Sequence, residues 1–204
     1  MTRKRNLKNP VLVYGVGIND SCYVTQVKST GLVCPFFMVW RNMLKRAYSH
    51  SEHARRPSYL GTIICAEWLS FMSFRSWMET QSWQGKQLDK DLLSPGNKEY
   101  RPDRCCFVGH NINSFLTESS ASRGDLPIGV NLHKATGKYA AQIQMCGKGR
   151  KHIGLFTSPE DAHKAWLFEK NKLALMLAAK ESDPRISSAL SSRYSHNYRK
   201  QESK

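Results

Sequence analysis

Three consecutive charged residues, Asp89, Lys90 and Asp91, are the first candidates for chemistry in this chain of 204 residues. They fall in the segment 61–122, which carries six basic and seven acidic side chains, whereas residues 1–60 carry ten basic and two acidic ones. Carboxylates hold divalent cations, while cationic side chains hold phosphate. A basic chain with one carboxylate-bearing segment therefore favours a metal-dependent nuclease, although an ordinary charged strand surface can carry the same triplet.

The charge of the whole chain indicates a polyanionic partner. The formal net charge is +15, and 40% of the residues are hydrophobic, which is too many for a disordered basic tail. Clustered positive charge attracts phosphate and releases its counterions. Double-stranded DNA is the expected partner, with RNA as the alternative.

Cysteine usage and hydropathy predict the compartment. The six cysteines contain no CxxC pair, so we expect free thiols and neither a zinc ribbon nor a redox motif. The basic start is followed by a polar stretch, not a secretory signal, and no run of about 18 apolar residues exists. We expect a cytoplasmic protein with no membrane contact and no small-molecule cofactor; the sequence leaves the oligomeric state open.

Periodicity outlines the elements of the first half. Apolar residues at spacings of three and four predict a helix over 36–48, and a second helical region, rich in aromatic residues, covers 65–80. We interpret those aromatic side chains as core and not as a platform for stacked bases. A short strand is possible over 11–17.

The second half predicts strand, loop, strand and short helix over 87–116, then a sheet and a helix. Three short alternating strands are expected at 129–131, 138–145 and 152–156, with glycine turns between them. Ser158 and Pro159, followed by two acids, mark a strong helix start.

This second region resembles a known DNA-binding domain. The strings Gly129-Val130, Gly137 to Ile143 and Ile153 to Trp166 resemble the ethylene-response-factor domain, which places a three-stranded sheet in the major groove with a helix behind it. Strand alternation puts Lys138, Ala140, Gln142 and Gln144 on one face. Lys138 can hold phosphate and the glutamines can pair with base edges. The predicted DNA-binding residues are Lys134, Lys138, Gln142, Gln144, Lys148, Arg150 and Lys151.

The region around the charged triplet looks like tailed-phage HNH proteins related to homing endonucleases. The resemblance rests on the strings Leu88-Asp89-Lys90-Asp91-Leu92-Leu93, Gly96-Asn97-Lys98, Phe107-Val108 and Ile112-Asn113, with Trp40-Arg41-Asn42-Met43-Leu44 and Cys65-Ala66-Glu67-Trp68-Leu69 upstream. It implies a ββα-metal finger in which Asp89 and Asn113 bind Mg²⁺ or Mn²⁺ and Asn97 orients the base.

Position 90 departs from that family, because a lysine stands where the general-base histidine normally does. A lysine is ordinarily protonated at pH 7 and cannot accept a proton. Three outcomes are open: Lys90 has a depressed pKa and acts as the base; it stays charged and stabilises the transition state while Asp91 or His110 takes the proton; or the site is inactive. The second is favoured by a small margin.

The sequence thus predicts an α+β protein: a ββα-metal module with helical decoration, followed by a three-stranded antiparallel sheet plus helix DNA-binding domain. Its expected activity is metal-dependent hydrolysis of duplex DNA in the host cytoplasm, if the chain is phage-encoded. The alternative is an inactive DNA-binding protein or regulator built on a decayed HNH fold. The expected organisation is a basic N-terminal segment 1–35, a nuclease module 36–118, a DNA-binding domain 123–177 and a basic flexible tail 178–204.

Overall fold

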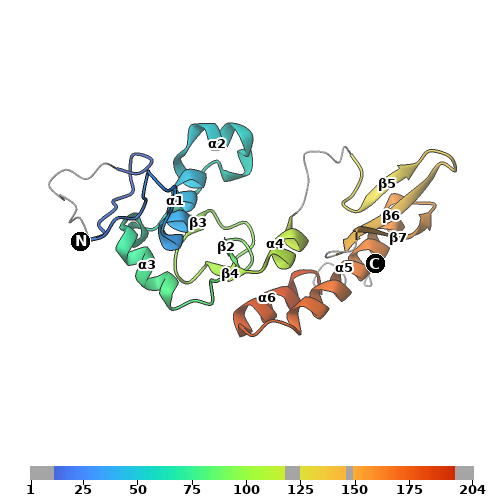
Figure 1. Cartoon of the computed structure of the whole chain (residues 1–204). Helices are drawn as coiled ribbons and strands as arrows, with labels where there is room; N and C mark the ends of the chain where they lie inside the picture. Colours follow the sequence, from blue (N-terminus) through green and yellow to red (C-terminus); the bar gives the residue numbers. More distant parts are fainter. Residues whose placement is uncertain (1–11, 118–124, 146–148, 196–204) are drawn as a thin grey trace. The chain divides into compact units, whose positions relative to one another are not determined.

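A computed structural model of the chain describes residues 12–117, 125–145 and 149–195 (Figure 1). The chain divides into two compact units, Met1–Phe107 and Val108–Lys204. The boundary therefore precedes the short helix after the charged triplet, whereas the sequence placed it between 118 and 123. No helix in the described part of the chain has the length and hydropathy needed to cross a membrane.

The first unit is built around two amphipathic helices. Its elements are α1 (Pro35–Tyr48), α2 (His50–Arg55), η1 (Pro57–Tyr59), β1 (Ile63–Ile64), η2 (Ala66–Leu69), α3 (Phe71–Glu79), β2 (Gln87–Asp89), β3 (Glu99–Tyr100) and β4 (Cys106–Val108). Strand β1 pairs in parallel with β3, and β2 pairs with β4. Both pairings tie the loop after β2 to the rest of this unit.

Aromatic side chains fill the core of the first unit, as the sequence predicted. Trp40, Trp68, Phe71 and Phe74 are fully buried, and the Trp40 indole donates to the Trp68 carbonyl at 2.7 Å. The helical region predicted over 65–80 is divided at Ser70, whose hydroxyl caps α3 by accepting from the Ser73 amide. A serine that can cap a helix start competes with continuation of the helix before it.

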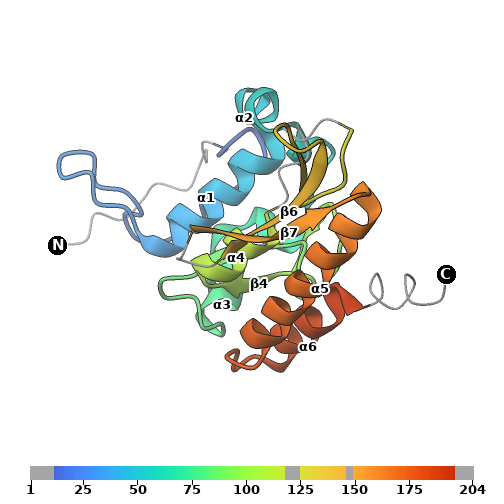
Figure 2. The same ribbon diagram turned by 90° about the vertical axis from the view of Figure 1, so that its right-hand side faces the viewer.

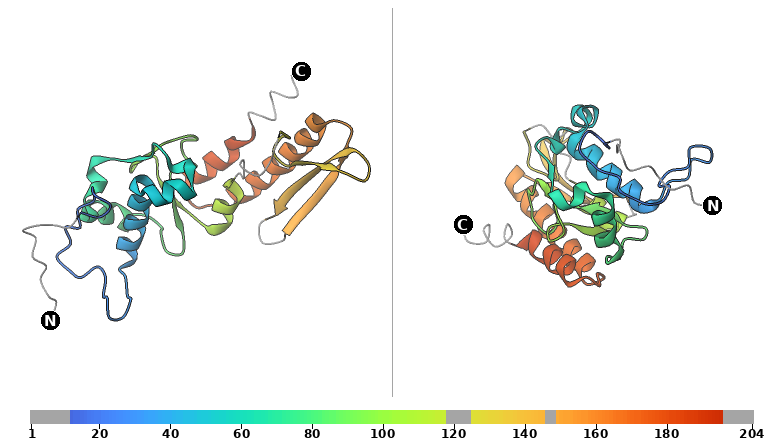
Figure 3. Two further views of the ribbon diagram at one scale, coloured as in Figure 1. Left: turned by 90° about the horizontal axis from the view of Figure 1, so that it is seen from above. Right: turned by 90° about the vertical axis from the view of Figure 1, so that its left-hand side faces the viewer.

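The described part of the N-terminal segment belongs to the first unit and is not merely a basic extension. Asp20 accepts hydrogen bonds from the Ser70 hydroxyl and the Met72 amide at 2.6 and 2.9 Å, fixing the start of α3. Gly17 lies against α1 so closely that a Cβ there would come within 2.4 Å of Leu44. Residues 24–33 form a narrow loop before the N-terminal end of α1 (Figure 3).

The second unit contains a three-stranded antiparallel sheet with one long helix packed on it (Figure 2). Strand order is β5-β6-β7, and α5 contacts all three strands while α6 packs beside α5. The elements are α4 (His110–Leu116), β5 (Val130–His133), β6 (Lys138–Met145), β7 (Gly149–Phe156), α5 (Pro159–Ala178) and α6 (Pro184–Arg193). The mixed α+β class and the predicted sheet-then-helix order are confirmed.

Helix α6 occupies part of 178–204, where the sequence predicted a flexible tail, and residues 196–204 of that tail lie outside the described residues. Asp183 caps this helix by accepting from the Arg185 amide, and Pro184 occupies its first turn. Ile186 and Leu190 are buried. Asp183 followed by Pro184 is a typical helix start, but the segment after it has too weak an apolar periodicity to predict a helix.

Candidate functional site

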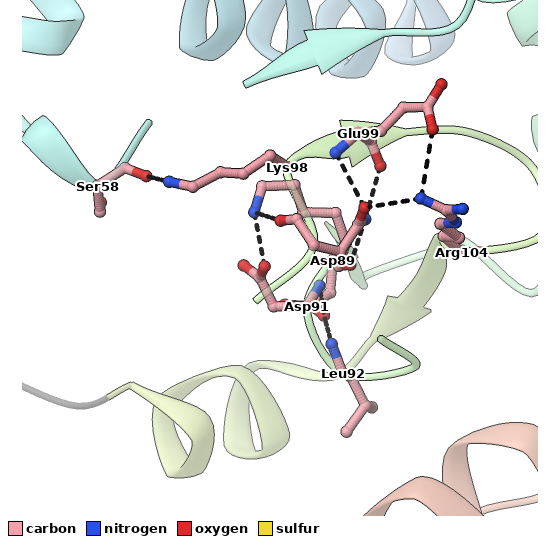
Figure 4. Close-up of polar contacts among 9 residues, drawn as sticks. Ser58, Asp89, Asp91, Leu92, Lys98, Glu99 and Arg104 are labelled. Carbon is pink, nitrogen blue, oxygen red and sulfur yellow. Dashed lines mark hydrogen bonds and ion pairs between the residues drawn. The ribbon is translucent and has the colours of Figure 1, made fainter. Parts of the chain in front are cut away.

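The turn after β2 arranges the charged triplet through its own backbone. Oδ1 of Asp89 accepts from the amides of Asp91 at 3.0 Å and Leu92 at 2.7 Å (Figure 4). Oδ2 accepts no hydrogen bond from the described residues. Burial raises the pKa of this carboxyl, and the Asp91 charge acts in the same direction, while the Leu92 and Asp91 amides oppose the shift. One carboxylate oxygen is thus fixed by the turn.

Lys90 is buried and points its ammonium group into the same loop. Only 5% of the residue is exposed, and Nζ donates to Asp91 Oδ1 at 2.6 Å and to the Asn97 carbonyl at 2.7 Å. Both partners are acceptors, and one is a carboxylate, so this environment suits a charged ammonium. The three outcomes open at position 90 stay predictions.

Asn97 closes the loop that runs from β2 to β3. Its amide nitrogen donates to the Lys90 carbonyl at 2.9 Å and to the Glu99 carbonyl at 2.6 Å, while its Oδ1 accepts from the Glu99 amide at 3.0 Å. These bonds fasten the backbone of residue 90 to the start of β3. Asn97 is therefore a positioning residue for Lys90.

Sequence reasoning did not select Arg104, which joins this network. Its Nη1 lies 3.4 Å from both Asn97 Oδ1 and Glu99 Oε2 (Figure 4). The side chain is 41% exposed, so a cation stands at the rim of the loop. No motif or periodicity points to Arg104, because loop contacts of this kind arise only from the folded path of the chain.

His110 and Asn113 lie on α4, in the second unit. His110 is the exposed first residue of that helix, and Asn113 is partly buried one turn later. Asp89 belongs to the first unit, so the predicted metal pair takes one ligand from each unit. The pairing of Asp89 with Asn113 stays a prediction.

No group of three or more His, Cys, Asp or Glu side chains able to hold a metal ion occurs among the described residues. The predicted site needs no such group, since it consists of one carboxylate and one amide oxygen. Mg²⁺ commonly keeps several waters and binds through one or two carboxylates together with substrate phosphates. The oxygen donor at Asp89 fits that kind of ion.

The register of the second sheet sorts its side chains into two faces. Val130 and Ala141 lie opposite one another and pack with Ala162 of α5, so their face is covered by the helix. The residues on the opposite side form what we call the outer face. It comprises Asn131 and His133 on β5, Lys138, Ala140, Gln142 and Gln144 on β6, and Arg150, His152 and Leu155 on β7.

A register shift decides which basic residues reach the outer face. Ala141 pairs with Gly154 but Gln142 pairs with His152, so Ile153 is an extra residue on β7. After this bulge, Arg150 shares a face with Gln144, whereas Lys151 lies opposite Ile143 and bonds Glu169 of α5 at 2.7 Å. Lys151 thus belongs to the helix-covered side.

The other predicted DNA-binding residues are distributed as follows. Lys138, Gln142 and Gln144 share the outer face, as alternation predicted. Lys134 is exposed in the turn between β5 and β6. Lys148 lies outside the described residues.

Close packing between Gly129 and Trp166 fixes α5 against the sheet. Gly129 has φ +82°, and a Cβ there would come within 2.0 Å of the Trp166 ring. His163 also ties α5 to this segment, because Nδ1 lies 2.9 Å from the Ile128 carbonyl. These contacts explain why glycine and tryptophan stand at the two positions.

Comparisons with family models, with curated proteins and with solved structures found no match to this chain.

Proposed function

We propose that this protein is an HNH-type, metal-dependent endonuclease that nicks or cleaves double-stranded DNA. The observation that carries the proposal is the loop after β2, in which a partly buried carboxylate with one uncommitted oxygen stands beside a buried ammonium group. Phosphodiester hydrolysis needs a divalent cation and positive charge at the phosphate. One turn of the chain supplies both a carboxylate ligand for the cation, from Asp89, and a positive charge, from Lys90.

In this proposal, as the resemblance to HNH proteins implies, Asp89 and the Asn113 amide oxygen would hold Mg²⁺ or Mn²⁺. The bound ion would polarise the scissile phosphate. The Lys90 ammonium, already paired with Asp91 and the Asn97 carbonyl, stabilises the negative charge that builds up on the phosphate oxygens. Asn97 keeps Lys90 in place.

The proton of the attacking water passes to Asp91 or His110. Oδ1 of Asp91 is held by Lys90, and the side chain is 48% exposed, so its other oxygen can meet solvent. His110, exposed at the start of α4, is the stronger candidate, because an imidazole is the usual general base at neutral pH.

Duplex DNA is the proposed substrate because the second unit presents a polar sheet face with a cation at either end, Lys138 and Arg150. The resemblance of this unit to the ethylene-response-factor domain supports the same choice. The major groove of DNA is wide enough to admit β-strands.

Incubation with supercoiled plasmid tests the activity. Nicking with Mg²⁺ or Mn²⁺, abolished by EDTA and by Asp89→Asn, is the expected result. The matched control is Asp103→Asn, which changes an exposed carboxylate paired with Arg101 outside the proposed metal site. Plasmid that is retarded on a gel but not cut would favour the alternative, an inactive DNA-binding protein. Stronger competition by structured RNA than by duplex DNA would show that RNA is the ligand.

A further inference from the structure

The outer face of the second sheet is ordered in rows, because residues that pair across strands stand side by side. Asn131, Ala140 and Leu155 form one central row, and Gln142 with His152 forms the next. At the two ends of β6 stand the rows of Lys138 with His133 and of Gln144 with Arg150.

The cations mark the ends of this face and the centre carries none. Lys138 and Gln144 are six residues apart on β6, which corresponds to about 20 Å of strand, and Arg150 lies opposite Gln144. The major groove is about 12 Å wide and has a phosphate backbone on either side. A strand laid across it brings Lys138 and Arg150 to the phosphates and the central rows to the base edges.

Two central amides have no partner in the described part of the chain. The side chains of Asn131 and Gln142 make no hydrogen bond to any described residue, whereas the Gln144 amide donates to the Gly149 carbonyl at 3.0 Å. An uncommitted amide both donates and accepts, which matches the N6 and N7 edge of adenine.

Leu155 is the apolar exception on this polar face. It is 40% exposed and lies outside the core formed by Val130, Ala141 and Ala162. Its cross-strand neighbour, Ala140, is buried, so Leu155 is the apolar group that this row offers to a ligand. The methyl group of thymine is the apolar feature of the major groove.

We propose that the outer face reads A·T base pairs in the major groove, with Gln142 pairing with adenine and Leu155 contacting thymine methyl groups. The central rows hold no Arg or Lys for the paired acceptors of guanine, and the imidazole of His152 presents one ring nitrogen at a time. This inference rests on the proposed binding of duplex DNA and names the bases that the site selects.

Selection from a random duplex library tests it, using the full chain with Asp89→Asn so that bound DNA stays intact. We expect enrichment of A·T pairs at adjacent positions. Gln142→Ala should lower discrimination at one of them on the order of tenfold while the others keep their preference, and Gln142→Arg should change that position to guanine.

A second measurement isolates Leu155. Replacing thymine by deoxyuridine in the selected duplex removes only the methyl groups, and it should weaken binding of the Asp89→Asn chain but not of the same chain with Leu155→Ala. Binding without base preference, or selection of G·C pairs that Gln142→Ala leaves unchanged, would overturn the inference and spare the nuclease proposal. Failure to bind any duplex would overturn both.

Discussion

The ammonium group of Lys90 lies 2.6 Å from the carboxylate of Asp91, although the lysine side chain is 6% exposed and the aspartate side chain 48% exposed. The pair therefore joins a buried cation to a carboxylate at the surface. Because the Asn97 carbonyl also accepts from Nζ, the lysine is held at a fixed place beside Asp89. In the proposed mechanism this is the charge that meets the phosphate.

Replacing Lys90 by methionine should abolish most of the nicking while duplex binding is kept. The loss of one charged donor to a transition state typically lowers kcat by about 10²- to 10³-fold. Lys90→Arg, which keeps the charge, should retain part of the rate. Single-turnover cleavage, with thermal unfolding to check the fold, measures both; full activity in Lys90→Met would contradict the role of this cation.

The pKa of Asp89 predicts how stability changes with pH. Burial raises this pKa, so the folded chain favours the protonated carboxyl. Its stabilising effect is complete below the unfolded pKa, and it is lost as pH rises through the raised folded value. Asp89→Asn keeps an oxygen for the Asp91 and Leu92 amides and carries no charge, so its free energy of unfolding relative to wild type should increase with pH.

Urea unfolding of both proteins between pH 3 and neutrality, in EDTA, gives this difference directly. Asp103→Asn serves as the reference, because the pKa of Asp103 is lowered: burial opposes the shift, but the hydrogen bonds from Arg101 and the Asp103 backbone, together with the charges of Arg101 and Arg104, outweigh it. The free energy of unfolding of Asp103→Asn relative to wild type should therefore decrease as pH rises. If the difference for Asp89→Asn did not change with pH, the pKa of the Asp89 carboxyl would not be raised.

Gly129→Ala should destabilise the second unit strongly. The added methyl group meets the Trp166 ring, and φ +82° is strained for any L side chain. Gly137 has φ +67° and open space around its Cβ position, so Gly137→Ala isolates the backbone strain of about 1 kcal/mol. Thermal unfolding should show the larger loss for Gly129→Ala; equal losses would refute the packing argument.

Lys170 is expected to stabilise the second unit by joining α4 to α5. Its Nζ donates to the Phe115 carbonyl at 2.6 Å and lies 3.9 Å from the centre of the Phe115 ring. A cation at a helix C-terminus satisfies carbonyls that lack helical partners. Lys170→Met should cost about 2 kcal/mol, against little for the exposed Lys172→Met. Similar unfolding midpoints for the two variants would show that the contact between Lys170 and Phe115 does not stabilise this unit.

Local patterns in the sequence predicted the larger elements well. The 3.6-residue period gave α1, alternation gave the three strands of the second sheet, and the Ser158-Pro159 start gave α5, because each signal lies within one element. The two-residue strands β1 and β3 were missed, since so short a pairing leaves no period to detect.

The candidate site was only partly predictable. The identity of the triplet drew attention to Asp89, but the role of Asn97 as a bridge between Lys90 and Glu99 depends on how the loop folds back. The bulge at Ile153 sends Lys151 to the helix side, and a one-residue shift of register is not visible in alternation alone. Long-range register and loop closure are the parts that local patterns do not encode.

The most direct measurement of the central claim is anomalous diffraction from a crystal of the chain bound to duplex DNA and soaked in Mn²⁺. We predict a single strong peak about 2.1 Å from an Asp89 carboxylate oxygen, with the Asn113 amide oxygen and a DNA phosphate oxygen also in its coordination shell. Bound DNA with no peak at Asp89, or with manganese held elsewhere on the chain, would contradict the proposed nuclease site.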